Sequence, residues 1–470
     1  MEKEEEKVNI AIHLHKDSKE PVYMQLYYYF KTEILTGKIE SGTKLPSIRH
    51  LASFLQISKN TVIAAYQQLW MEGYVESKEK SGYVVVALPS YEYTATLTQV
   101  GHKQSQKVEE NYLIDFQYGD IDTTNFPINA WKKTVKEVME DKQFNWMMYG
   151  NKQGELLLRE ELVGYLYRSR GIQTTANQLI ITAGTEHLIH LVLSLLEKNS
   201  LCIGMEEPGY DGVRNVFKER ELPIYPIPVQ EEAGHDFSAL NSLCNLIYVT
   251  PSHQFPIGKI MSISKRIELL EWAEKVDGYI LEDDYDSEFR FQGSPIPSMK
   301  AIDQQDRVIY MGTFSKAFLP SLRISYMILP DTLLEKWRKK SITESQSSSP
   351  LLQLALGLFI QKGEFERHIK RIRKVYERKY TFLVQCITKY MGDKVEIIGE
   401  KAGMHLLIRV PPKKEDVFIT EAKKIGIKVY STKPYYSQER EDYPLLLGFG
   451  GLKEKEVEEG IQHLAQVWFT

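Results

Sequence analysis

The sequence has little cysteine, little net charge and no long apolar run. Its three cysteines, Cys202, Cys244 and Cys386, are widely separated and form no CxxC pair, which argues against disulfides and against a zinc or other metal site. A formal net charge of -4 over 470 residues indicates no particular class of partner. No apolar run approaches membrane-spanning length, and the charged start Met1–Lys7 lacks the apolar core of a signal peptide. We therefore expect a cytoplasmic protein.

The sequence does contain enough apolar material for more than one core. A hydrophobic content of 43% with 26% charged residues is typical of a globular protein, and 470 residues exceed one ordinary domain. Residues 89–111 are polar with little periodicity, so we expect a flexible linker there. The predicted domains are therefore 1–88 and 112–470.

The first segment shows the order helix, helix, turn, helix, hairpin. Apolar residues recur at helical spacing between residues 21 and 36, and Ser47 and Ser58 are each placed to cap a following helix. After Gly73 the pattern changes to two short strands around the charged tip Lys78–Gly82. This order predicts a winged helix-turn-helix, an α+β fold.

The stretch from Leu45 to Tyr74 resembles the GntR class of winged-helix DNA-binding domains. It matches the pattern LPS-x-R-x-LA followed by S-x-NTV-x-x-AY-x-x-L. The resemblance implies that the helix after Ser58 enters the major groove of double-stranded DNA. Lys59 stands where many relatives have arginine, and lysine lacks the bidentate fork that selects a base. The DNA contacts implied by the resemblance are Arg49, Ser58, Lys59, Asn60 and Thr61, with Lys78 and Lys80 contacting phosphate.

Charge alone would not identify this segment as DNA-binding. Residues 1–90 contain equal numbers of basic and acidic residues, although the basic ones concentrate between Lys44 and Lys80. Winged helices also serve as protein–protein modules. The S-x-NTV match favours DNA.

The most informative stretch of the second domain surrounds Lys316. It stands in Gly312-Thr313-Phe314-Ser315-Lys316, directly after an apolar strand. Burial among small residues lowers the pKa of a lysine and lets it form a Schiff base with an aldehyde. The neighbouring hydroxyls and Arg323 suit a phosphate group. A lone lysine after a strand is usually a surface residue, so the interpretation depends on residues upstream.

Asp283 and Tyr285 lie thirty-three and thirty-one residues before Lys316, at the end of an apolar strand that begins at Tyr279. A buried aspartate there can keep a pyridine nitrogen protonated. A solvated loop or a carboxylate metal site would also fit the acidic run taken alone. With Lys316, these residues resemble the fold-type I aminotransferases, which bind pyridoxal 5'-phosphate (PLP). The resemblance implies a doubly covered, mostly parallel α/β sheet with a small C-terminal α/β subdomain.

The resemblance also implies the remaining contacts of PLP. Tyr285 would reach the ring oxygen and Tyr210 would stack on the ring, while Tyr149 would reach the phosphate held by the other subunit of a homodimer. A strand followed by glycine and a helix can bind phosphate through backbone N–H groups at the helix start. The predicted cofactor contacts are Lys316, Asp283, Tyr285, Tyr210, Arg323, Thr313, Ser315, Gly184, Thr185 and Tyr149.

A GntR-type module joined to an aminotransferase-like domain is the layout of the MocR/GabR family of bacterial transcription regulators. We therefore expect a regulator that binds promoter DNA and senses an amine, an amino-acid-like ligand or PLP itself. The alternatives are an active aminotransferase that also binds DNA, and a regulator whose PLP domain serves only for dimerisation.

Two departures from the related patterns bear on catalysis and on the effector. Phe255 stands where aminotransferases have an asparagine that bonds the ring oxygen, so we expect weak turnover and assign no catalytic residue beyond the Schiff-base lysine. Gly212 and the run Leu445–Leu452 lack the arginines that hold the carboxylate of GABA in related sensors. GABA is therefore not the expected effector.

Overall fold

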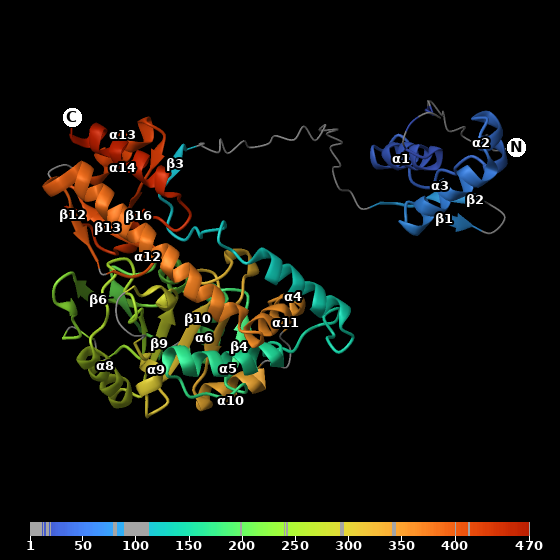
Figure 1. The fold of residues 1–470 in the computed structure, drawn as a ribbon. Coiled ribbons are helices and arrows are strands. Elements are labelled where there is room, and N and C mark those ends of the chain that lie inside the picture. Colours follow the sequence, from blue (N-terminus) through green and yellow to red (C-terminus); the bar gives the residue numbers. More distant parts are fainter. Residues whose placement is uncertain are drawn as a thin grey trace, which may run out of the picture. The chain divides into compact units, whose positions relative to one another are not determined.

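The structure is a computed structural model that divides into two compact units, Met1–Glu109 and Glu110–Thr470 (Figure 1). The predicted linker 89–111 lies outside the described residues, so the domain boundaries remain predictions. Among the helices that are described, none is both long and apolar enough to cross a membrane. The structure describes residues 12, 14–15, 18, 20–78, 82–88, 112–197, 200–238, 240, 243–291, 296–340, 345–399, 401–411 and 414–469.

The first unit is the predicted winged helix-turn-helix. Its elements are α1 (Val22–Leu35), α2 (Ile48–Phe54), α3 (Lys59–Met71), β1 (Val75–Lys78) and β2 (Gly82–Val85). The two predicted caps are present: the Oγ atoms of Ser47 and Ser58 accept hydrogen bonds from backbone N–H groups three residues later. The core is formed by one apolar face of each helix and includes the buried residues Phe30, Leu51 and Tyr66.

The second unit is built on an eight-stranded sheet with the order β4-β11-β10-β9-β8-β5-β6-β7. Strands β6, β5, β8, β9 and β10 run parallel, whereas β11 is antiparallel to both neighbours and β7 is antiparallel to β6. The strands are β4 (Leu179–Thr182), β5 (Ile203–Glu207), β6 (Ile224–Gln230), β7 (Gly234–His235), β8 (Leu246–Val249), β9 (Tyr279–Asp284), β10 (Val308–Thr313) and β11 (Ser325–Ile328).

Both faces of this sheet are covered, as the sequence predicts. Successive residues of a strand point to opposite faces, so Ile181 and Tyr310 join one apolar cluster while Ile180 and Ile309 join another. Helix α10 was not predicted. The helices of this region are α4 (Ile128–Glu140), α5 (Leu156–Arg170), α6 (Thr185–Leu195), α7 (Asp211–Glu219), α8 (Ile263–Lys275), α9 (Met299–Ile302), α10 (Asp331–Lys340) and α11 (Pro350–Gln361), with the short 3-10 turns η2 (Ser287–Phe289) and η3 (Pro320–Leu322).

A smaller subdomain follows the long helix α12 (Glu364–Met391). Its four-stranded sheet has the order β12-β13-β16-β15, and the first strand of the unit, β3, pairs in parallel with β14. The start of the second unit is thereby joined to its C-terminal part (Figure 1). The elements are β3 (Ile114–Asp115), β12 (Glu396–Ile398), β13 (His405–Arg409), β14 (Ile427–Lys428), β15 (Tyr430–Ser431), β16 (Leu445–Gly448), α13 (Glu415–Lys424), α14 (Glu454–Phe469), η5 (Gly392–Lys394) and η6 (Lys433–Tyr435).

Candidate functional site

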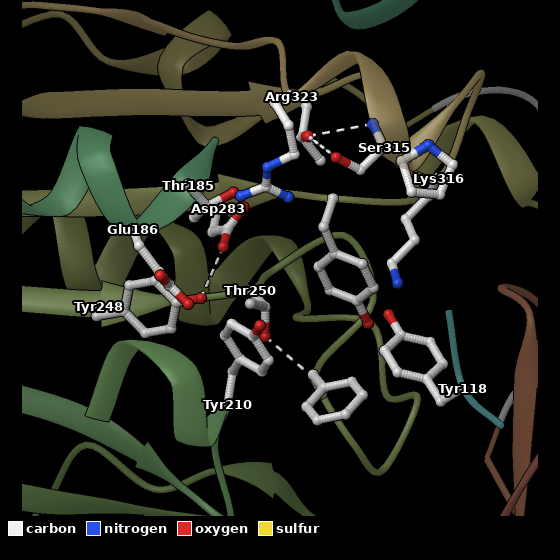
Figure 2. A pocket seen from close by; sticks show the side chains of 14 residues that line it. Tyr118, Thr185, Glu186, Tyr210, Tyr248, Thr250, Asp283, Ser315, Lys316 and Arg323 are labelled. Carbon is white, nitrogen blue, oxygen red and sulfur yellow. Dashed lines mark hydrogen bonds between the residues drawn. The ribbon is translucent and has the colours of Figure 1, made fainter. Parts of the chain in front are cut away.

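A cavity of about 220 Å³ lies at the carboxyl ends of the central strands of the large sheet (Figure 2). Ligands commonly bind at this edge in open α/β sheets, because the loops that follow parallel strands gather there. Its lining residues are Tyr118, Thr185, Glu186, Tyr210, Tyr248, Thr250, Phe255, Asp283, Tyr285, Thr313, Ser315, Lys316, Pro320 and Arg323.

Successive side chains of a strand point to opposite faces of the sheet, so the acidic residues at the end of β9, Glu282, Asp283 and Asp284, have different surroundings. Asp283 and Tyr285 line the cavity. Glu282 and Asp284 do not line it: Asp284 pairs with the Nε atom of Arg170 at 2.7 Å, and Glu282 accepts two backbone N–H groups at the start of α9. These carboxylates are buried, so the alternative of a solvated loop is wrong.

Asp283 lies at the floor of the cavity, where the hydroxyl of Tyr248 donates a hydrogen bond to its Oδ2 atom at 2.7 Å. Burial raises the pKa of the Asp283 carboxyl to about 7, although the bond from Tyr248 acts in the opposite direction. A carboxylate that is costly to ionise alone is stabilised when a cationic ring nitrogen comes to face it. Tyr248 comes from the neighbouring strand β8, and its role was not predicted from the sequence.

Lys316 follows β10 and is covered by the segment Tyr118–Gly119. Its Nζ atom lies 4.3 Å from the ring centroid of Tyr118, and a Cβ atom at Gly119, where φ is +101°, would meet Nζ at a clashing distance. Burial lowers the pKa of the lysine to about 8, against the opposing effect of Asp286 and Asp120. A substantial neutral fraction near physiological pH suits a nucleophilic amine.

The opposite end of the cavity is built to hold an anion (Figure 2). Arg323 follows η3 in the left-handed conformation, with φ of +51°. Its guanidinium lies against Gly184, where any Cβ atom would clash with it and where φ is +102°. Helix α6 begins at the next residue and directs backbone N–H groups toward this end.

Two hydroxyl groups complete the anion-binding end. The hydroxyl of Thr313 donates to the Oγ atom of Ser315 at 3.0 Å and accepts from Ser325 at 2.9 Å. A guanidinium, a helix start and hydroxyls at one end, with a lysine at the other, fit the phosphate and the aldehyde of PLP.

The rings of Tyr118, Phe255, Tyr435 and Tyr210 pack together beside Lys316 and form an aromatic wall. Phe255 is buried, with its ring centroid 5.0 Å from that of Tyr118 and 4.8 Å from that of Tyr435. Tyr210 meets Phe255 edge to face at 5.8 Å. The hydroxyl of Tyr285 donates to the backbone carbonyl of His253 at 2.7 Å. Phe255 therefore offers the cavity a ring and no hydrogen-bonding group.

The predicted DNA contacts lie in the first unit. Arg49, Lys59 and Asn60 are exposed, whereas Thr61 is half-buried with its hydroxyl 2.9 Å from that of Ser58. Lys78 on β1 is exposed and pairs with Glu76 at 2.9 Å. Lys80 lies outside the described residues. Helix α3 thus presents its first residues to solvent, as entry into a major groove requires.

Comparison with known proteins assigns both units to families. Residues 22–85 match the bacterial regulatory proteins of the gntR family, and residues 112–463 match aminotransferase class I and II. The HTH-type transcriptional regulator YdeL of Bacillus subtilis, described as uncharacterized, is 42% identical over 95% of this chain and 97% of its own length. The probable rhizopine catabolism regulatory protein MocR of Rhizobium meliloti is 32% identical over 97% of this chain and 96% of its own.

The chain belongs to the MocR/GabR family of transcriptional regulators. Among solved structures, the kynurenine aminotransferase of Pyrococcus horikoshii superimposes with a TM-score of 0.69 at 25% identity, over 76% of this chain and 90% of that one. An archaeal alanine:glyoxylate aminotransferase gives a TM-score of 0.69 at 26% identity, over the same shares. The fold-type I aminotransferase fold predicted for the second unit is thus confirmed.

Within this MocR/GabR member, the structure brings most of the predicted cofactor residues to one cavity. Gly184 adjoins the cavity through Arg323. Tyr149 does not line it and is 99% exposed, so its role toward a second copy remains a prediction. The lining residues that the sequence analysis did not assign as contacts are Tyr118, Glu186, Tyr248, Thr250, Phe255 and Pro320.

Proposed function

We propose that this regulator binds double-stranded promoter DNA through its winged helix and binds PLP in its aminotransferase-like unit, where it senses a small molecule. The observation that carries the proposal is the meeting of Lys316, Asp283 and Arg323 at one cavity. These three residues supply an amine, a carboxyl and a guanidinium to one cavity, from the segment after β10, from β9 and from the segment after η3 (Figure 2).

Each end of the cavity has a role toward PLP. Arg323, the start of α6 and the hydroxyls of Thr313 and Ser315 would hold the phosphate. Asp283 would pair with the pyridine nitrogen, and Tyr210 would contact the ring. When bound, PLP supplies an aldehyde that condenses with primary amines. The burial that lowers the pKa of Lys316 prepares its amine for that condensation.

The aromatic wall favours sensing over turnover. Phe255 cannot donate a hydrogen bond, and the hydroxyl of Tyr285 is directed to the carbonyl of His253. Catalysis needs donors that stabilise developing charge in the transition state, whereas binding does not. The regulator therefore holds a small molecule in an aminotransferase-like pocket with little chemical conversion.

We infer that a second copy of the chain completes the phosphate end of the cavity, because Tyr149 does not line the cavity of its own chain. Met147, Met148 and Tyr149 form an apolar loop and are 75%, 61% and 99% exposed. Apolar side chains clustered on a surface are typical of interfaces. The second copy covers this loop and receives Tyr149 at its own phosphate end.

Reduction with borohydride tests the cofactor assignment. In PLP-loaded protein it should fix a phosphopyridoxyl group to the peptide that contains Lys316, as read by mass spectrometry. Lys316→Ala should lose this label completely, while the control Lys340→Ala, an exposed lysine at the end of α10, should keep it. Labelling of another lysine, or a label that persists in Lys316→Ala, would overturn the proposal.

A further inference from the structure

The part of the cavity beside Lys316, which we call the mouth, is bounded on one side by backbone. Residues 117–120 lie directly on the glycines that end and follow β16. A Cβ atom at Gly448 would meet the carbonyl oxygen of Gln117, and one at Gly450 would meet that of Asp120, both well inside van der Waals contact. No side chain fits at position 448 or 450 without displacing this segment. The C-terminal sheet therefore directs no charged group from these positions toward Lys316.

Helix α7 is closed to a larger side chain in the same way. A Cβ atom at Gly212 would lie 2.7 Å from the Cζ atom of Tyr210 and 2.8 Å from its hydroxyl oxygen. A longer residue at position 212 would push the Tyr210 ring away from the cavity that it lines. Position 212 therefore contributes no charged group to the cavity.

The charged groups that do face Lys316 are carboxylates. Asp286 and Asp120 both act electrostatically on the lysine. Asp286 is buried: its Oδ2 atom lies 2.9 Å from Nδ1 of His253, while its Oδ1 atom has no hydrogen-bond partner among the described residues. Asp120 is exposed next to Tyr118–Gly119, the segment that covers Lys316, so a ligand that arrives from solvent can meet it.

Of the nearby basic groups, His253 pairs with Asp286, so Asp120 is the carboxylate that is left to meet a ligand. Lys428, which acts on Asp120, lies 3.5 Å from Asp115 and 4.8 Å above the ring of Tyr430. Burial lowers the pKa of His405 to about 3, so this imidazole is neutral. Arg323 lies at the opposite, anion-binding end of the cavity (Figure 2).

The ring of Tyr118 adds a surface that attracts a cation. Its face already carries the Lys316 amine at 4.3 Å. An ammonium is stabilised over such a ring, whereas a carboxylate is not. The rings of Phe255 and Tyr435 continue this wall and suit an apolar body.

We propose that the mouth beside Lys316 selects small primary amines in their ammonium form and disfavours ligands that carry a carboxylate. Asp120 and the ring of Tyr118 recognise the ammonium. The inference rests on the proposed function, since the mouth adjoins the PLP site. It narrows the sensed molecule to a carboxylate-free amine.

Calorimetric titration of PLP-loaded protein with matched pairs of probes tests this selection. The pairs are 2-phenylethylamine with phenylalanine, and butylamine with 4-aminobutanoate, which differ by one carboxylate. Each amine should bind about tenfold or more tightly than its partner, because a like-charge contact costs affinity. Equal or tighter binding of the carboxylated member, or no saturable heat from either amine, would overturn the inference.

Variants of the mouth separate recognition from folding. Asp120→Asn should weaken amine binding about three- to tenfold and narrow the preference within each pair. The matched control is Asp393→Asn, an exposed aspartate in η5, which should leave amine binding unchanged. An unchanged preference in Asp120→Asn would overturn the role of Asp120.

The visible absorption of bound PLP, recorded in each sample, keeps the two proposals apart. If PLP loads and carboxylated ligands are preferred, this inference fails while the proposed function stands. If PLP does not load, the proposed function fails. The pairs are then titrated into the cofactor-free protein, in which Asp120 and Tyr118 are still present and the same amine preference is expected.

Discussion

The two units of this regulator use their side chains in opposite ways. In the winged helix, Arg49, Lys59 and Asn60 are exposed on the surface, close to one another in sequence. In the aminotransferase-like unit, Asp283 and Lys316 are largely enclosed, and burial moves the pKa of each toward neutrality. The first unit presents charge to a large polyanion, whereas the second assembles a chemical environment around a small molecule.

This difference determines what a substitution should do. A surface contact can be removed without disturbing the fold, and the loss appears in binding alone. A buried titratable group also contributes to the stability of its unit, so its removal should change the pH dependence of folding.

The largest effect should come from Asp283 in the cofactor-free protein. Its folded pKa of about 7 lies above the ordinary value of 3.8, so the folded form keeps a proton that the unfolded form releases. The free energy of unfolding of the second unit should therefore fall by about 2–4 kcal/mol as the pH rises from 4 to 7, and then level off. Urea unfolding at several pH values measures it.

Asp283→Asn is the matched variant for this pH series. It should lose about half of the dependence, because burial also raises the pKa of Glu288 to about 7 and this group contributes a similar slope. The same slope in Asp283→Asn and in the unsubstituted protein would contradict the assignment.

Arg323→Ala should weaken binding of PLP to the cofactor-free protein by about ten- to a hundredfold, since a charge-assisted contact to phosphate is worth roughly 1.5–3 kcal/mol. Visible absorption during titration with PLP gives the affinity. Arg338→Ala on the surface of α10 is the control and should leave it unchanged. Binding of DNA should be the same in both variants.

Lys59→Ala should weaken DNA binding by about 1–3 kcal/mol if the lysine contacts a base, with relaxed selectivity at one position. If it contacts phosphate, all sequences should lose affinity alike and the salt dependence should flatten by about one unit of slope. Fluorescence anisotropy on operator and random duplexes distinguishes the two. The control is Gln67→Ala, which changes an exposed residue near the other end of α3. An unchanged DNA affinity in Lys59→Ala would show that α3 is not the recognition helix.

Ser58 gives the smallest and most specific test, because its hydroxyl caps α3 and was also predicted to contact DNA. Ser58→Ala should destabilise the first unit by about 1 kcal/mol. Ser58→Asp should restore the cap, since a carboxylate also accepts the N–H of Thr61, but should repel phosphate. Recovered stability with poor DNA binding separates the two roles, whereas recovery of both would exclude contact with DNA.

Residues that share a local motif were predictable from the sequence. The caps Ser47 and Ser58 and the strand-end positions of Asp283 and Lys316 follow from patterns within a few residues. Helix α10 was missed although Leu333, Leu334 and Trp337 recur at helical spacing there, so that signal was available.

Residues that reach the cavity through tertiary structure were not predictable. Tyr118 covers Lys316 from 198 positions away in the sequence. Tyr248 lies within an apolar strand, where a tyrosine is normally interpreted as a core residue. Its hydrogen bond to Asp283 depends on the pairing of β8 with β9. The hydrophobic periodicity of the sequence indicates neither of these two contacts.

The segment over Lys316 has a mechanical consequence. Strand β3 pairs with β14, and Tyr118 follows it by three residues. The stretch 112–118 begins where the predicted linker ends. It contains β3 and also places Tyr118 over the amine of Lys316. Because the pairing of β3 with β14 anchors this stretch, a ligand that displaces Tyr118 must work against that pairing. Access to the Lys316 amine is therefore tied to the stability of a two-residue parallel pair in the C-terminal part of the unit.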